Sequence, residues 1–341
     1  MRCMSNIWNI NALLSTYWGM YLIQIMLHSI VVAVLVECAI MAWQIRNPAS
    51  RQWLRVMVLA LPLIAFPAFQ FLSPDRGTIF FRLESLLDSN SLLLLDLPGA
   101  VPMIVPLLIV LGLSSIIFLV QELIPVITNT IAHMRGESDL FAEDIDELLS
   151  EKIGLALSGL PISQDSVAVL EDDDLVLYSS TGTNPIICVS TGMLRRYDID
   201  HLQGAFAHEI AHIHRSRRPL LMFAYMLRAV MFFNPVAMIE FRRLAQEEEK
   251  ACDDYAIAMT GKPRALAEAI GMLRPAPVLE VQEPDGKSGH PLEIALEDYG
   301  HDILLKSRIL RLQELPSDIA LWGVPHLATF AAFVVIAYYV V

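Results

Sequence analysis

The sequence predicts an α-helical membrane protein with a small α+β domain inserted between its transmembrane helices. Of the 341 residues, 55% are hydrophobic and 18% are charged, and the mean hydropathy is +0.51. A soluble domain carries about a quarter charged residues, so the excess of apolar side chains is expected to face lipid. The apolar residues lie in a few long runs, and most of the charged residues lie in one block before the last run.

Four hydrophobic segments are long enough to cross a bilayer, which requires ~20 apolar residues. The first is longer than the apolar part of a signal peptide, so it is interpreted as a permanent anchor. Prolines lie inside or beside these segments, and lipid-embedded helices tolerate them. The predicted spans are residues 17–43, 53–72, 101–127 and 319–341. They divide the chain into an N-terminal membrane domain at 1–131, an inserted domain at 132–318 and a C-terminal transmembrane helix.

Basic residues predict the orientation. The short loop 44–55 carries Arg46, Arg51 and Arg55 and no acidic residue, so it is expected in the cytoplasm. This places the N-terminus outside and residues 132–318 in the cytoplasm, where the scattered cysteines suit a reducing compartment. The net charge of −13 argues against nucleic acid as a partner.

The inserted domain combines short strands with longer helices. Residues 166–170, 175–179 and 186–190 are short runs with β-strand character, separated by turn-prone acidic and glycine-containing segments. A helix is predicted to begin near Asp198 or Asp200, either of which can cap it, and to continue through His214.

This helix contains the strongest chemical signal, His208-Glu209-Ile210-Ala211-His212. Residues four apart project from one face of a helix, so both imidazoles can reach one ion. Hydrolytic zinc sites take three protein ligands and keep one position for water. Glu209 is placed to take the proton of that water and pass it to a leaving amine. Because such a motif also occurs by chance, its position on a capped helix after β-runs is what favours a metal site.

A third ligand is expected from the run Glu247, Glu248 and Glu249. Glu247 and Glu248 are interpreted as solvated surface charges, and either would replace Glu249 as the ligand if the helix phase differs. The apolar stretch 219–239 lies between this run and the histidines. If it crossed the membrane once, the glutamates would lie on the opposite side. Asn234-Pro235 breaks the helix into pieces too short to span, which predicts a re-entrant or interfacial hairpin that returns to the same side.

The pattern HEIAHIHR, then FNP, then EEEKACDDYA resembles the BlaR/MecR-type membrane zinc metallopeptidases of bacterial antibiotic sensing, and more distantly the HtpX and CAAX proteases. VSTGMLRRYDIDHLQGAFAHEIAH and the KSRILRL stretch belong to the same resemblance. It implies a gluzincin (zincin-like) fold in the bacterial inner membrane, with Glu249 of an E-x-x-C-D pattern as third zinc ligand. It further implies that Asp253 supports a ligating histidine, and that 186–190 is an edge strand beside an extended substrate.

The expected activity is zinc-dependent cleavage of a protein substrate at the cytoplasmic membrane face, with a signalling role. The antibiotic sensors carry a penicillin-binding domain after the last span. This sequence holds none and has no Ser-x-x-Lys motif, so direct β-lactam sensing is not expected and a separate sensor or regulator is a candidate partner. The alternatives are a non-catalytic membrane signalling or scaffold protein with a structural zinc site and, last, a zinc transporter.

Overall fold

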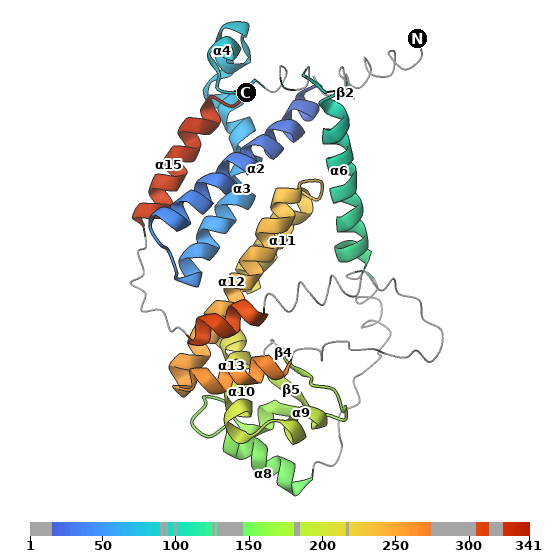
Figure 1. Cartoon of the computed structure of the whole chain (residues 1–341), viewed down its shortest axis with the longest axis vertical. Helices are drawn as coiled ribbons and strands as arrows, with labels where there is room; N and C mark the ends of the chain where they lie inside the picture. The colour runs from blue at the N-terminus through green and yellow to red at the C-terminus, as the bar shows by residue number, and fades with distance from the viewer. Residues whose placement is uncertain are drawn as a thin grey trace, which may run out of the picture. The chain divides into compact units, whose positions relative to one another are not determined.

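The computed structural model describes residues 16–88, 92, 95–98, 101–124, 127, 146–180, 185–215, 218–273, 305–313 and 323–341 (Figure 1). The chain forms two compact units, each built from separate stretches of sequence. Unit 1 contains Met1–Gly136, Arg218–Glu247 and Asp318–Val341. Unit 2 contains Glu137–Arg217 and Glu248–Ser317.

Among the residues of unit 1 that the structure describes, three helices are long and apolar enough to cross a membrane. They are α2 (Tyr17–Ala42), α3 (Pro48–Leu72) and α6 (Ile104–Phe118), which continues as a π-helical turn, η2, to Leu123. Shorter elements are η1 (Pro74–Gly77), α4 (Ile79–Glu84), and the paired strands β1 (Asp96–Leu97) and β2 (Val101–Pro102).

The C-terminal helix is shorter than the sequence suggested. Helix α15 covers Val324–Tyr338, 15 residues, where a span over 319–341 was expected. It follows Gly323, whose φ of 107° is a left-handed conformation that does not continue a helix. At 1.5 Å per residue α15 is ~22 Å long, less than the ~30 Å of a hydrocarbon core. Its Phe333 and Ala337 pack against the core that α2 and α3 share.

The helix break predicted at Asn234-Pro235 is present. Four residues separate helix α11 (Arg218–Val230) from α12 (Pro235–Thr260), and Asn234 Oδ1 accepts the backbone N–H of Val236 at 3.0 Å. Asn234 Nδ2 also donates to Ser29 Oγ at 2.8 Å, midway along α2. Buried residues of α2, α3, α11 and the start of α12 share one apolar core, and Figure 1 shows α11 beside α2 and α3. The re-entrant path through a membrane stays a prediction.

Two buried arginines of unit 1, Arg55 and Arg228, are paired with opposite charges. Arg55 on α3 contacts Glu240 on α12 at 2.6 Å and Glu37 on α2 at 3.1 Å. Arg228 on α11 contacts Glu122 of η2 at 2.8 Å. Unpaired charges would be costly in an apolar environment, so these pairs fix where the helices of unit 1 meet.

Unit 2 contains a three-stranded sheet covered by helices. Its strands are β3 (Val167–Leu170), β4 (Leu177–Ser180) and β5 (Ile186–Ser190), which confirm the three predicted β-runs. The strand order is β3-β5-β4, with β5 parallel to β3 and antiparallel to β4. The expectation that residues 186–190 form an edge strand is therefore wrong. Both sides of β5 are paired inside the sheet, so it has no open edge for a substrate.

The helices of unit 2 are α8 (Glu147–Ala156), α9 (Thr191–Arg196), α10 (Ile199–Arg215), the second half of α12 and α13 (Pro263–Met272), with the short η3 (Gln164–Ser166) before β3. Leu202, Phe206 and Ile210 recur every four residues along α10 and are fully buried. Gly204 lies on the contact with α13, where a Cβ would meet the backbone of Leu266 at 3.2 Å. This close packing holds α10 against α13.

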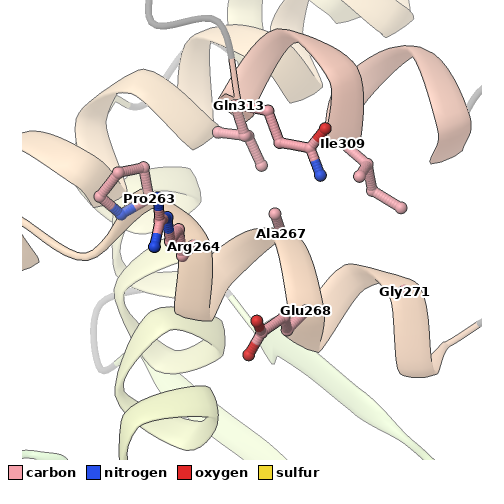
Figure 2. Close-up of a pocket in the computed structure, with 8 residues that line it drawn as sticks. Pro263, Arg264, Ala267, Glu268, Gly271, Ile309 and Gln313 are labelled. Atoms are coloured by element: carbon pink, nitrogen blue, oxygen red, sulfur yellow. The ribbon is translucent and has the colours of Figure 1, made fainter.

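Residues 305–313 form a further helical segment, which we call the 305–313 helix. Leu305 and Leu312 are buried in the core of unit 2. A groove of about 660 Å³ lies between this helix and α13. Figure 2 shows Ile309 and Gln313 on one side of the groove and Ala267 and Glu268 on the other. One face of the 305–313 helix is thus anchored by apolar contacts in unit 2.

Candidate metal centre

Helix α10 carries the first two histidines of the site. It begins where the sequence predicted, because Asp198 Oδ1 accepts the backbone N–H of His201 at 2.8 Å and so caps the first turn. His208 and His212 lie one turn apart on the same face. Their ring centroids are 4.8 Å apart and their planes are nearly perpendicular.

Three donor groups converge at this face. Nε2 of His208 lies 3.2 Å from Nε2 of His212 and 3.3 Å from Oε2 of Glu249, while Oε1 of Glu249 lies 3.5 Å from Nε2 of His212. Ligands held at ~2.0–2.1 Å around a tetrahedral zinc ion are separated by roughly 3.3 Å. Two imidazoles and one carboxylate also form a donor set of hydrolytic zinc sites. The residues present therefore fit a zinc ion in both chemistry and spacing.

Helix α12 supplies Glu249, and the side chains of the two preceding glutamates point toward arginines. Glu247 contacts Arg51 at 3.5 Å, and Glu248 contacts Arg215 at 3.4 Å. Both glutamate side chains are buried, with exposures of 3% and 4%, so the expectation that they are solvated surface charges is wrong. They lie beside basic partners because successive residues of a helix point about 100° apart. Of the three, it is Glu249 that lies with the histidines.

Each histidine is supported on the side away from the converging atoms. Nδ1 of His208 lies 3.0 Å from Oδ1 of Asp253, one turn after Glu249 on α12. Nδ1 of His212 lies 3.4 Å from Sγ of the buried Cys252. Such contacts fix the orientation of an imidazole and leave Nε2 for a metal.

The charges of this cluster shift its pKa values. Burial lowers the pKa of His208, but Asp253 and Glu249 outweigh it and raise that pKa to about 9. Burial and the charge on His208 lower the pKa of His212. Burial raises the pKa of the Glu249 carboxyl, but contact with His208 outweighs it and lowers that pKa to about 2. Without a metal, His208 is therefore the protonated imidazole of the pair at neutral pH.

A cavity of about 200 Å³ opens beside the converging donors. Glu209, His208 and Glu249 line its polar side, and most of the remaining wall is apolar, with Leu177 of β4 and Ile270 of α13 among its residues. Tyr197 also lines it and donates its hydroxyl to Ala269 O at 2.7 Å. The cavity thus places Glu209, the predicted base, beside the candidate metal position and an apolar pocket.

The structure brings one residue to the site that sequence reasoning missed. Arg308 of the 305–313 helix lines the same cavity, and its Nη1 lies 3.0 Å from Oε2 of Glu249. One sequence feature could have indicated this contact. Arg308 and Arg311 lie three residues apart, and in the structure they pair with the adjacent acidic residues Asp253 and Asp254. No rule of local sequence pairs residues 55 positions apart, so the contact became visible only in the fold.

Comparison with known proteins finds a family and a relative that the chain resembles. The sequence model of the family described as BlaR1 peptidase M56 matches residues 179–270, which include both histidines and Glu249. Protease HtpX homolog 1 of Streptomyces coelicolor (strain ATCC BAA-471 / A3(2) / M145) is 26% identical over 27% of this chain and 42% of its own length. The matched family is described as a peptidase and the matched relative as a protease. The matched part spans less than half of that relative, and Arg308 lies outside the family match.

The affinity of the protein for zinc is expected to rise with pH between 6.5 and 8.5. Zinc binds neutral imidazole, while His208 without metal holds a proton up to a pKa of about 9, so binding must release that proton. The apparent affinity should therefore increase up to about tenfold per pH unit, and His212, with its lowered pKa, should not add to the slope. Chelator competition at several pH values measures this. Asp253→Asn should flatten the dependence, and a flat wild-type profile would contradict the assignment.

Proposed function

We propose that this protein is a zinc-dependent endopeptidase that cleaves a protein substrate at the cytoplasmic face of a bacterial inner membrane. The observation that carries the proposal is the convergence of His208, His212 and Glu249: the two Nε2 atoms lie 3.2 Å apart, and each lies 3.3–3.5 Å from one oxygen of the Glu249 carboxylate. That spacing suits one tetrahedral ion. The match to metallopeptidases over residues 179–270 supports the same chemistry.

The roles of the chain's own residues follow from their places around the cavity. A zinc ion held by the two histidines and Glu249 would activate a water molecule and polarise a peptide carbonyl. Glu209 lines the cavity beside His208 and acts as the base that takes the proton of the attacking water. Glu209 then gives the proton to the leaving amine. Asp253 holds His208 in the orientation that presents Nε2.

The apolar wall of the cavity favours one class of cleavage site. A space of about 200 Å³ lined by aliphatic side chains such as Leu177, Leu266 and Ile270 accommodates one apolar side chain of a substrate and disfavours a charged one. We therefore propose cleavage next to an aliphatic or aromatic residue, in a protein substrate that reaches the membrane surface.

The cellular setting is proposed from the charge pattern and the resemblance. The basic loop between α2 and α3 supports a cytoplasmic position for that loop and for unit 2, with the N-terminus outside. A role in signalling, with a separate sensor or regulator protein as partner, is in keeping with the match to the BlaR1 peptidase M56 family.

Removal and return of the metal test the proposal. The full-length protein in detergent is expected to contain close to one zinc per chain and to cleave casein or itself. Treatment with a chelator should remove both metal and cleavage, and added Zn²⁺ should restore both. Protein that binds no zinc would overturn the proposal. Zinc without cleavage under any condition would favour a scaffold with a structural metal.

A further inference from the structure

Arg308 reaches the candidate metal centre from a segment that the family match does not include. Its guanidinium forms two bonds to Asp253, from Nε to Oδ2 at 2.8 Å and from Nη2 to Oδ1 at 2.7 Å. The third nitrogen, Nη1, lies 3.0 Å from Oε2 of Glu249. Only 15% of the Arg308 side chain is exposed. A guanidinium that uses all three nitrogens on two carboxylates is held in one orientation.

The two carboxylates that Arg308 contacts serve different ligands. Glu249 is itself one of the three converging donors, and Asp253 lies against Nδ1 of His208, a second donor. Nη2 of Arg308 lies 3.4 Å from Nε2 of His208. One guanidinium therefore contacts one ligand directly, Glu249 on α12, and also contacts the carboxylate beside another ligand, His208 on α10.

We propose that Arg308 is a positioning residue of the metal site, and this rests on the proposed function. By contacting Oε2 of Glu249, the oxygen that also faces Nε2 of His208, Arg308 fixes the orientation of this carboxylate at the metal position. By bonding both oxygens of Asp253, it fixes the carboxylate that orients His208. Its positive charge also offsets the repulsion between Glu249 and Asp253, which lie one turn apart in a mostly buried place.

Arg311 provides a matched control on the same helix. Its Nη2 donates to Oδ2 of Asp254 at 2.7 Å, so it joins the 305–313 helix to α12 by the same kind of pair. Asp254 is 42% exposed, whereas Asp253 is 2% exposed, and Asp254 is not among the converging donors. Leu305 and Leu312 remain as apolar anchors when either arginine is replaced. Loss of Arg311 removes a link between helices without touching the ligands.

The experiment compares Arg308→Met, Arg308→Lys and Arg311→Met in the full-length detergent-solubilised protein. Zinc affinity is measured by chelator competition, the visible spectrum is recorded with Co²⁺ in place of zinc, and Tm is recorded for each variant. Arg308→Met should lose about 10–100-fold in zinc affinity and change the Co²⁺ spectrum. Arg308→Lys, which keeps the charge but contacts one carboxylate at a time, should fall between Arg308→Met and wild type. Arg311→Met should bind zinc as wild type does.

Two results would overturn the inference. One is an Arg308→Met protein with the zinc affinity and Co²⁺ spectrum of Arg311→Met. The other, decisive if Arg308→Met does not fold, is an Arg308→Lys protein indistinguishable from wild type in both. Wild-type protein that binds neither Zn²⁺ nor Co²⁺ would instead show that the proposed function fails, so the two failures are separable.

Discussion

Glu209→Gln is expected to retain zinc and to lose proteolytic activity by about 10²–10⁴-fold, the usual contribution of a positioned general base. Glutamine has nearly the same shape as glutamate but cannot accept the proton of the attacking water. Glu209 lines the cavity but is not one of the three converging donors, so its replacement should leave the metal site intact. Zinc content by elemental analysis and cleavage of a casein or peptide substrate measure the two effects on one sample.

Glu268→Gln serves as the matched control for this change. Glu268 lies on α13 in the same unit, and its carboxylate is 67% exposed and contacts His201 at 3.0 Å. The same chemical substitution there should leave both zinc content and cleavage close to wild type. A Glu209→Gln protein that cleaves as fast as Glu268→Gln would show that Glu209 is not the base. If neither variant nor wild type cleaves although all three bind zinc, the scaffold alternative gains support.

Features determined by neighbouring residues were predictable from the sequence. The start of α10 follows from one capping residue, Asp198, and the shared face of His208 and His212 follows from their spacing of four. The three β-runs and the break before Pro235 are likewise local, because β-branched residues and proline restrict their own backbone. These predictions needed no knowledge of what the segments would pack against.

Features that depend on partners distant in the sequence were not predictable from the sequence. The order of strands in the sheet of unit 2 places β5 in the centre, and no local pattern distinguishes a central strand from an edge strand of similar composition. The burial of Glu248 depends on Arg215, 33 residues earlier, and the place of Arg308 depends on Asp253, 55 residues earlier. A run of acidic residues is therefore interpreted as exposed to solvent unless its basic partners in the fold are known.

Glu249→Gln is expected to lower zinc affinity by more than about 100-fold, because it removes a ligand, whereas changes to outer partners typically cost 10–100-fold. Cleavage should fall with the metal. An amide oxygen is a much weaker zinc ligand than a carboxylate, although the side chain keeps its size. Chelator competition and cleavage assays with excess Zn²⁺ measure the loss, and excess metal should restore part of the activity.

The neighbouring glutamates make this test selective, since Glu247→Gln and Glu248→Gln carry the same change on the same turn of α12. Their carboxylates contact Arg51 and Arg215 instead of the histidines, so these variants should keep zinc. They should lower Tm, because each removes the charge of a buried carboxylate that is paired with a partly buried arginine. If Glu248→Gln lost the metal and Glu249→Gln kept it, the helix phase that assigns the third ligand would be wrong. Loss of zinc only in Glu249→Gln would establish that one carboxylate of three completes the site, and that the other two stabilise the helix that presents it.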